Sequence, residues 1–526
     1  MVGRVAALGG ALINYVPTHY WKGGRGQPVT EYCYMDSSQT CIRFDPASAA
    51  SFRSGMELCF RQAIAAGLGI SLVPHLDDGG SSNIWRNGLV FSPKTKYGGM
   101  SYQEVMLNPL ADALAAAIVA EPAGRRGVPI RFALQGEMSA TVLRFPAEYA
   151  QLHDEMRDRI LRGMARLGAS PEQLAAQREV TKVGVSFNFN RLLSTNPADA
   201  DSGTTGSFAS NILALMTGGN NIRVPGGASG GLARLFSRGL LGRGPSPDAV
   251  GEAEERSASS GPDGGLGPEL DQDAEGGAGG VAGGVGDVAG VVGGGGGRSL
   301  LSNGIDLAAL ADLFERTEFL GVSAYAPLAA NFEPEDLQAS MATFYLEMRD
   351  KVGLDVVAII DRRNRQQQQQ QRLGSGAAWQ GPAVELHYSE FGVGGGTFSG
   401  VMPALTPAAA ANAPYFGMPV HYRPNTDPWA NGLMRDFLRS FYSRSLSWLS
   451  RGGGPLIPIS HCFAWNMASW DVLGIYPEST NSYGSYRDPT VADMVVQHNR
   501  RVREWWASAP ASSSQPQEQP QPPVAK

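Results

Sequence analysis

The sequence predicts an α/β protein folded as a (β/α)8 TIM barrel. Two observations carry this prediction: seven short apolar runs alternate with longer amphipathic segments, and a glutamate stands just past two of those runs. The alternation is typical of a parallel sheet with crossover helices. Because the runs are apolar on nearly every residue, both faces of the strands are expected to be buried. That favours a closed barrel or a doubly wound sheet over a sandwich.

The apolar runs are the expected strands, in chain order. They cover residues 12–16, 69–73, 130–134, 183–187, 319–323, 384–388 and 457–463. Apolar residues recur at helical spacing in three of the segments between them, 47–66, 101–120 and 146–167, which are expected to be helices. An eighth strand is missing from the pattern. Only eleven residues precede the first run, so the sequence is expected to begin one βα unit late.

Low-complexity composition interrupts the predicted barrel domain. Residues 261–300 hold 17 glycines and no aromatic side chain, which leaves too little apolar surface to offset the entropy of ordering them. We therefore expect 221–303 to be a disordered insertion between two parts of the domain. Those parts are 1–220 and 304–505, and a tail rich in Pro, Gln and Ser, 506–526, is also expected to be disordered.

Charge and cysteine content exclude several classes of function. The net charge is −6 and no basic run is long enough for phosphate binding, so no nucleic-acid partner is expected. No stretch reaches the ~18 apolar residues that a membrane span needs, which predicts a soluble protein. None of the four cysteines has the paired spacing of a zinc site. Cys33 and Cys41 could form a disulfide in a secreted protein, but free thiols are favoured. Compartment and oligomeric state are left open.

The two glutamates at the ends of apolar runs point to glycoside chemistry. Glu137 follows the run 130–134, and Glu390 follows the run 384–388. The carboxyl ends of barrel strands share one face, where two carboxylates can act as acid and nucleophile on one bond. Glu385 is the rival of Glu390, but it lies inside the strand, where a buried carboxylate needs a partner. The pair therefore predicts a glycosidase.

Short motifs at the expected strand ends resemble those of clan A glycoside hydrolases, most closely the family 113 type of β-mannanase-like barrels. The resemblance covers roughly residues 1–220 and 304–505. The matching motifs are residues 15–21 (YVPTHYW), 72–77 (LVPHLD), 135–137 (QGE), 323–327 (SAYAP), 389–390 (SE) and 463–465 (FAW). Each is short, and their order at successive strand ends is the specific signal.

The resemblance implies roles for residues at matching positions. Glu137 would be the general acid/base and Glu390 the nucleophile, with Tyr325 donating a hydrogen bond to Glu390. The implied substrate-side groups are His75 and Asp77, Trp465 as the floor of the subsite, and Trp21 as a further aromatic platform. Tyr325 and Trp21 could instead be core residues.

One residue departs from the family pattern. Clan A barrels usually place Asn before the acid/base, where it binds the substrate 2-hydroxyl, and here that residue is Gly136. Either Gln135 or Asn188 supplies the missing hydrogen bond, or the site is weakened.

The sequence therefore predicts a retaining glycoside hydrolase that cleaves a β-linked glycan or oligosaccharide. Mannan-type substrates are the first expectation, from the resemblance alone, and neither a cofactor nor a metal is expected. The main alternative is a weakened or inactive carbohydrate-binding barrel, because of Gly136 and the missing first unit. A third alternative is a barrel hydrolase that uses His75 and Asp77 with a metal.

Overall fold

A computed structural model describes eleven segments of the chain. They are residues 2–23, 29–36, 38, 40–80, 84–192, 304–373, 383–396, 403–414, 428–453, 458–464 and 488–508. All of them belong to one unit, formed by Met1–Ile222 and Ser299–Lys526. The predicted insertion, 221–303, lies outside the described residues. The predicted tail overlaps them by three residues, because the last helix ends at Ser508.

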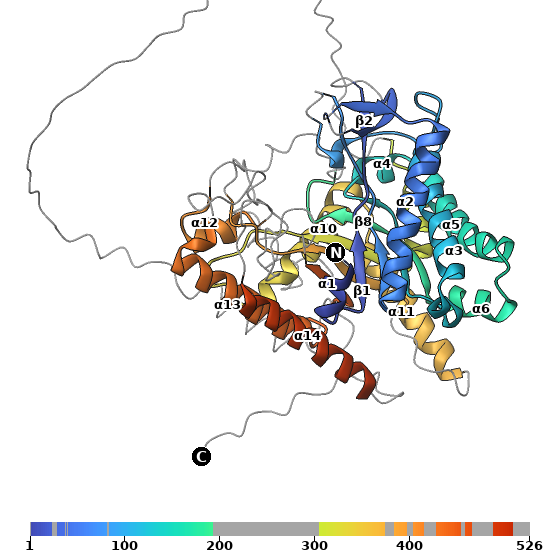
Figure 1. Ribbon diagram of the computed structural model, residues 1–526. Helices are drawn as coiled ribbons and strands as arrows, with labels where there is room; N and C mark the ends of the chain where they lie inside the picture. The colour runs from blue at the N-terminus through green and yellow to red at the C-terminus, as the bar shows by residue number, and fades with distance from the viewer. Residues whose placement is uncertain are drawn as a thin grey trace, which may run out of the picture. The chain divides into compact units, whose positions relative to one another are not determined.

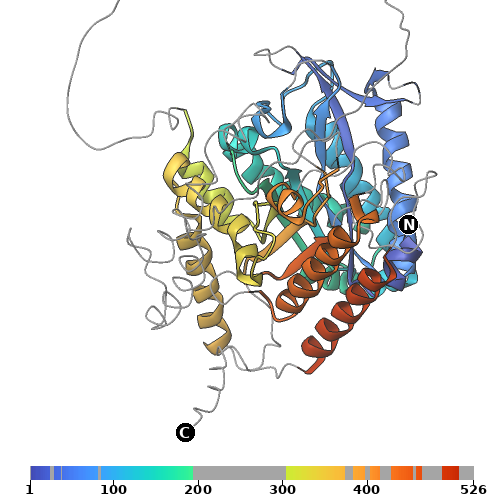
Figure 2. The same ribbon diagram turned by 90° about the vertical axis from the view of Figure 1, so that its left-hand side faces the viewer.

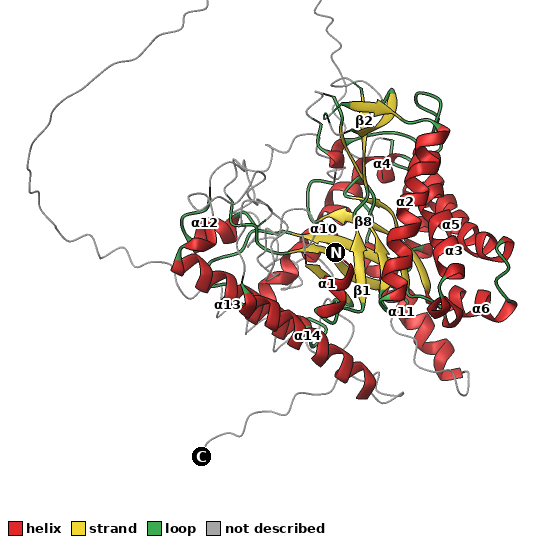
Figure 3. Ribbon diagram, viewed as in Figure 1, coloured by secondary structure: helices red, strands yellow, loops and turns green. Residues whose placement is uncertain are grey.

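A parallel sheet of seven described strands forms the centre of this unit (Figure 3). Its strands are β1 (Leu12–Tyr15), β5 (Gly69–Leu72), β7 (Ile130–Gly136), β8 (Thr181–Asn188), β9 (Phe319–Ala324), β10 (Glu385–Phe391) and β11 (His461–Ala464). They follow one another in the sheet in sequence order, as in a (β/α) barrel. All seven predicted strands are confirmed, and the bounds differ by a few residues.

The sheet curves until distant strands touch across its interior. The side-chain amide of Asn14 on β1 donates a hydrogen bond to the carbonyl of Ser389 on β10 at 3.2 Å. Arg131 on β7 binds Glu385 on β10, although β8 and β9 separate these two strands in the sheet. Such contacts require a nearly closed barrel, in which β1 and β11 are the two ends of the sheet among the described strands.

Helices cover the outside of the sheet (Figure 1). The α-helices are α1 (Val2–Ala7), α2 (Pro46–Ala65), α3 (Asn108–Ala120), α4 (Ser139–Arg144), α5 (Pro146–Arg166), α6 (Pro171–Val180), α9 (Leu307–Arg316), α10 (Ala339–Glu347), α11 (Val356–Leu373), α12 (Pro407–Asn412), α13 (Gly432–Leu449) and α14 (Pro489–Ser508). The shorter helical segments are η1 (Arg86–Gly88), η2 (Gln103–Leu107), η3 (Pro122–Arg126), η5 (Pro334–Gln338), η6 (Met348–Val352) and η7 (Pro428–Ala430). The three predicted helices correspond to α2, η2 with α3, and α5.

Neighbouring helices pack side by side around the sheet. In sequence order, α2 packs on α3, α3 on α5, and α5 on α9. The last two helices, α13 and α14, also lie together, as the orange and red ribbons of Figure 2 show. Helix α2 begins where it does because Asp45 caps it, Ser48 completes a capping box, and Pro46 occupies the first turn. None of the described helices is both long and apolar enough to span a bilayer.

The two faces of the barrel strands differ in chemistry, which corrects the expectation of strands that are apolar on both faces. On β7, Ile130, Phe132 and Leu134 join the main hydrophobic core beneath the helices. Arg131 alternates with them, and its contact with β10 shows that it faces the interior. The interior also holds small and polar residues that pair with one another. Burial of both faces is confirmed. The outer face is apolar, whereas the inner face combines polar residues with a small apolar cluster of Val73, Ala133 and Phe319.

A second sheet stands at the carboxyl end of the barrel, and sequence reasoning missed it. Its strands are β2 (Thr18–Lys22), β3 (Glu31–Met35), β4 (Cys41–Arg43) and β6 (His75–Asp78), in the order β4-β3-β2-β6. Pro17 and Pro74 separate β2 from β1 and β6 from β5, because proline lacks the N–H that a ladder needs. Trp21 on β2 is fully buried, so its ring is not available as a sugar platform.

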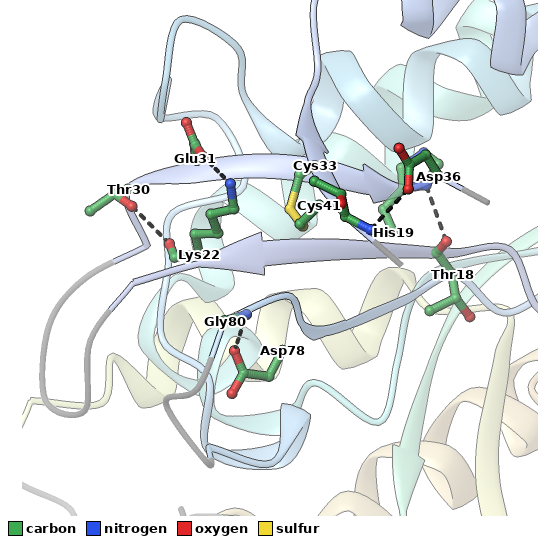
Figure 4. Close-up of a disulfide and its surroundings, with 11 residues drawn as sticks. Thr18, His19, Lys22, Thr30, Glu31, Cys33, Asp36, Cys41, Asp78 and Gly80 are labelled. Carbon is green, nitrogen blue, oxygen red and sulfur yellow. Dashed lines mark hydrogen bonds and ion pairs between the residues drawn. A yellow bond between two sulfur atoms is a disulfide. The ribbon is translucent and has the colours of Figure 1, made fainter. Parts of the chain in front are cut away.

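A disulfide joins Cys33 on β3 to Cys41 on β4, so the expectation of free thiols was wrong (Figure 4). The antiparallel register sets Cys33 opposite Arg43 and Cys41 opposite Met35, which brings the two Cα atoms to 5.4 Å. A spacing of eight residues could not reveal this pairing by itself. A Cβ at Gly79 would overlap Sγ of Cys41, so the disulfide packs against the end of β6. The same strand carries His75 and Asp77.

Candidate active site

Two buried glutamates converge at the carboxyl end of the barrel. Glu137 directly follows β7 and is 1% exposed, whereas Glu390 lies near the end of β10 and is 3% exposed. Burial raises the pKa of Glu390 well above its usual range, and the negative charge of Glu137 raises it further. Two carboxylates that repel each other in this way lie near one another, as acid and nucleophile must.

A bulge in β10 directs Glu390 inward. Strict alternation would place Glu385, His387 and Ser389 on the inner face and Glu390 on the outer face. The pairing of β10 with β9 shifts register between Tyr388 and Glu390, so Ser389 and Glu390 both face the interior.

A contact across β9 anchors this end of β10. The hydroxyls of Ser186 on β8 and Ser389 are hydrogen-bonded at 2.7 Å. They can meet because Gly321 lies beneath them, where a Cβ would stand 2.8 Å from Oγ of Ser186.

The backbone of Glu137 is left-handed, with φ at +58°, a conformation that costs a residue with a side chain about 1–2 kcal/mol. Hydrogen bonds from Gly136 N to the Pro74 carbonyl and from Glu137 N to the Ser186 carbonyl hold this turn. Strain of this kind persists where the surrounding structure imposes it, and it is frequent at active sites.

This strain leads to a stability prediction. Glu137→Gly and Glu137→Ala both remove the carboxylate, but only glycine removes the left-handed strain. Elsewhere glycine costs about 0.5–1 kcal/mol relative to alanine. Here we expect the Gly variant to be at least as stable as the Ala variant in urea unfolding. If the Gly variant unfolds at a clearly lower urea concentration than the Ala variant, the backbone of Glu137 is not strained.

Tyr325 and Asn188 each donate a hydrogen bond to one glutamate. The Tyr325 hydroxyl donates to Oε2 of Glu390 at 3.3 Å, and the Asn188 amide donates to Oε1 of Glu137 at 3.2 Å. Of the two residues that were candidates to replace the missing asparagine, Asn188 thus lies beside Glu137, and its contact with a substrate hydroxyl stays a prediction. The side-chain oxygen of Gln135 instead accepts from the backbone N–H of Met138 at 2.7 Å.

Arg86 in η1 joins the cluster, and sequence reasoning missed it. Its Nη2 lies 2.9 Å from Oδ1 of Asp77 and its Nη1 lies 3.5 Å from Oε2 of Glu137. Nη1 also contacts Nδ1 of His75. A single arginine in a loop has no sequence signature. Only its position between β6 and Glu137 marks it as a site residue.

The imidazole of His75 occupies the space next to Gly136. A Cβ at residue 136 would lie 2.5 Å from Nε2 of His75 and 2.5 Å from Cγ1 of Val73, so this position has no room for an asparagine. Nε2 of His75 lies 3.8 Å from Oε1 of Glu390. Burial, followed by the charge of Arg86, lowers the pKa of His75 well below its usual range, so the ring is neutral.

Six of the eight residues singled out from the sequence are therefore placed in one cluster. They are Glu137, Glu390, Tyr325, His75, Asp77 and Asn188. Trp21 is buried in the small sheet, and Trp465 lies outside the described residues.

A separate ionic cluster fills the amino end of the barrel interior. Both oxygens of Glu385 are occupied, by Arg131 at 2.5 and 2.8 Å and by Lys182 at 2.8 Å. His387 lies 3.0 Å from the same carboxylate. Glu385 thus has the partners that a buried carboxylate needs.

This ionic cluster also contains a set of three possible metal ligands, Glu385, His387 and His461. A metal ion there would have to displace the cations that already neutralise Glu385. In the part of the chain that the structure describes, no other such set occurs, so His75 and Asp77 are not joined by a third ligand.

Comparisons with known proteins add little to this description. No family model and no curated protein matches the chain. One similar solved structure is the GH113 β-mannanase of Alicyclobacillus acidocaldarius in complex with ManMIm, at 12% identity over 95% of this chain and 90% of that one, with a TM-score of 0.34. Another is a complex of a GH113 β-1,4-mannanase, at 8% identity over 95% and 91%, with a TM-score of 0.35. Likeness at this level does not bear on family or activity, and the fold rests on the sheet topology.

Proposed function

We propose that this protein is a retaining glycoside hydrolase that cleaves a β-linked glycan or oligosaccharide. The observation that carries the proposal is the convergence of two buried glutamates, Glu137 and Glu390, at the carboxyl end of one barrel. In retaining enzymes two carboxyl groups stand ~5–5.5 Å apart, and we expect that separation here. The motif resemblance makes mannan-type substrates the first to test.

In this mechanism Glu390 attacks the anomeric carbon while Glu137 gives its proton to the departing oxygen. A glycosyl ester on Glu390 forms as the glycosidic bond breaks. Glu137, now ionised, then takes a proton from water, which attacks the anomeric carbon and releases Glu390. Over the cycle Glu137 gives one proton to the departing oxygen and regains one from water, and Glu390 forms and then releases one covalent bond to the sugar.

Burial and the charge of Glu137 raise the pKa of Glu390 to about 8, so at neutral pH Glu390 holds a proton before substrate binds. For the first step that proton must be on Glu137. The hydrogen bond from Tyr325 favours an ionised Glu390, and the positive charge that develops on the sugar favours it further. The departing oxygen accepts the proton of Glu137, so bound substrate and Tyr325 favour the same arrangement.

One observation favours a second function, a carbohydrate-binding barrel without activity. Nη1 of Arg86 lies 3.5 Å from Oε2 of Glu137, so a guanidinium already contacts the carboxyl group that must reach the departing oxygen. A Glu137 that stays paired with Arg86 cannot give a proton to that oxygen. Activity therefore requires that substrate binding overcomes this contact, and a barrel in which it does not would bind sugars without cleaving them.

Product stereochemistry tests the two functions together. The protein is incubated with aryl β-glycosides and β-linked glycans, mannans first, and the first-formed anomer is followed by proton NMR. A β-anomeric product is expected, because two displacements at one carbon retain configuration. An α-anomeric product would mean single displacement, with carboxyl groups ~6.5–9.5 Å apart. A sugar that binds and is never cleaved would favour the binding barrel.

A further inference from the structure

Arg86 lies between two carboxylates and stands at different distances from them. Its Nη2 is 2.9 Å from Oδ1 of Asp77, which is hydrogen-bond distance, whereas its Nη1 is 3.5 Å from Oε2 of Glu137, beyond the usual range of such a bond. Nη1 also contacts Nδ1 of His75, which lies on β6 with Asp77. The guanidinium is therefore held mainly by β6, and Glu137 is its weaker partner.

The backbone on both sides of this contact is fixed. Asn87, the next residue of η1, donates from its side-chain amide to the carbonyls of Asn190 at 3.1 Å and Arg191 at 3.2 Å. On β6, Asp77 stands in parallel register with Tyr20 of β2. A change of partner would therefore be a movement of the arginine side chain, while both backbones stay in place.

Asp77 and Glu137 compete for the one guanidinium. The strongest pairing of an arginine is two-point, with two parallel N–H···O bonds to one carboxylate. Here Arg86 instead directs one nitrogen to each carboxylate. The Asp77 side chain is 36% exposed and that of Glu137 only 1%. Because charges attract more strongly where water is excluded, removal of the Asp77 charge would leave Arg86 to pair with Glu137.

We propose that Asp77 is a positioning residue that keeps Arg86 from forming a two-point ion pair with Glu137. Bound substrate can break the loose contact at 3.5 Å, whereas a buried two-point pair would leave Glu137 unable to protonate the departing oxygen. This assigns Asp77 a role inside the protein, in place of the substrate-side role that the motif resemblance implies. The inference rests on the proposed function for its effect on catalysis, but the competition for Arg86 does not depend on activity.

The first experiment measures the competition without any substrate. Urea unfolding of the full chain with Arg86→Met, Glu137→Gln and both together gives the interaction energy of Arg86 and Glu137. The same cycle is then repeated in the Asp77→Asn background, which keeps the shape of residue 77. The interaction energy there should be roughly twice the wild-type value or more, because Arg86 then pairs with Glu137 alone. An interaction energy that stays equal or falls would overturn the competition.

The second experiment separates positioning from substrate contact. Asp77→Asn should lower kcat/KM roughly tenfold or more for a β-glycoside with an alkyl leaving group, which needs an acid, and by much less for a dinitrophenyl β-glycoside, which needs little protonation. Addition of Arg86→Met to Asp77→Asn should recover most of the loss, because the two-point pair can no longer form. A loss of equal size on both substrates, or no recovery in the double variant, would overturn the proposal and leave Asp77 as a contact of the sugar.

A neighbouring carboxylate provides the matched control. Asp78 follows Asp77 on β6, and alternation along the strand places its side chain on the other face. Its Oδ1 accepts a hydrogen bond from the backbone N–H of Gly80 at 2.9 Å (Figure 4). An asparagine keeps this acceptor, so Asp78→Asn should change neither kcat/KM nor the interaction energy of Arg86 and Glu137. An effect as large as that of Asp77→Asn would overturn the specific role of Asp77.

Failure of the proposed function would be seen separately. If the wild type cleaves no β-glycoside, the first experiment still decides whether Asp77 and Glu137 compete for Arg86. A stronger interaction energy in the Asp77→Asn background without any activity would retain the competition and reject glycoside hydrolysis. Activity with an unchanged interaction energy would retain the hydrolase and reject Asp77 as its positioning residue.

Discussion

Glu390→Ala is expected to abolish turnover of an activated aryl β-glycoside, with kcat lowered on the order of 10⁴-fold or more. Without this carboxylate no glycosyl-enzyme can form, and a good leaving group cannot substitute for the missing nucleophile. Steady-state release of the aryl alcohol measures the loss. Glu179→Ala, at an exposed position on α6, is the matched control and should retain full activity.

Glu137→Ala should behave differently on the same substrate. The activated leaving group needs little protonation, so the first step persists, whereas the second step slows for lack of a base. The glycosyl-enzyme should accumulate as a burst, and added azide, which needs no base, should restore turnover. If azide instead restores Glu390→Ala with a glycosyl azide of retained configuration, and Glu137→Ala with one of inverted configuration, the roles of the two glutamates are exchanged. Retained turnover in both variants would exclude both as catalytic residues.

Arg131→Met is expected to lower the free energy of unfolding by about 3–5 kcal/mol, because it leaves the buried carboxylate of Glu385 without its main partner. Burial alone would raise the pKa of Glu385, but the hydrogen bond from His387 and the surrounding charges hold it well below its usual range. A carboxylate in this state remains charged after Arg131 is removed. Urea unfolding followed by near-UV circular dichroism measures the loss.

A matched pair on the surface provides the control. Arg159 binds Asp112 with the same two-point geometry, at 2.8 and 2.6 Å, but 35% and 25% of these side chains are exposed. Arg159→Met should therefore cost no more than about 1 kcal/mol. In the double variant Arg131→Met/Glu385→Gln, part of the loss should be recovered, because the stranded charge is gone. If Arg131→Met and Arg159→Met lower the free energy of unfolding equally, water must reach Glu385 in the barrel interior and solvate its charge.

Sequence reasoning succeeded where a pattern is local. Each barrel strand is a short run whose outward-facing residues must be apolar to pack under helices, so runs such as 130–134 are visible without a structure. A parallel order then follows from the helices between the runs, and it places the carboxyl ends of β7 and β10 on one face. That reasoning sufficed to select Glu137 and Glu390, whose catalytic roles stay predictions.

Sequence reasoning failed where inward-facing residues of a strand are polar, because their partners lie on strands that are distant in the chain. As a carboxylate inside its strand, Glu385 was expected to need a partner, but the partner could not be named: it is Arg131, across the barrel and 254 residues apart in sequence. Neither residue indicates its partner by spacing. The same limit applies to Cys33 and Cys41, whose pairing depends on the register of a small sheet that Pro17 and Pro74 split from the barrel strands.

The sequence by itself determined the seven strands, their parallel order and the end of the barrel at which both glutamates lie, because apolar periodicity and strand direction are properties of contiguous residues. Only the tertiary structure decided that a bulge turns Glu390 inward, that Arg86 enters the cluster from a loop, and that His75 fills the space beside Gly136. These features depend on strand register and on contacts between distant segments. The residues that a side chain meets across the barrel cannot be recognised from the spacing of residues in the sequence.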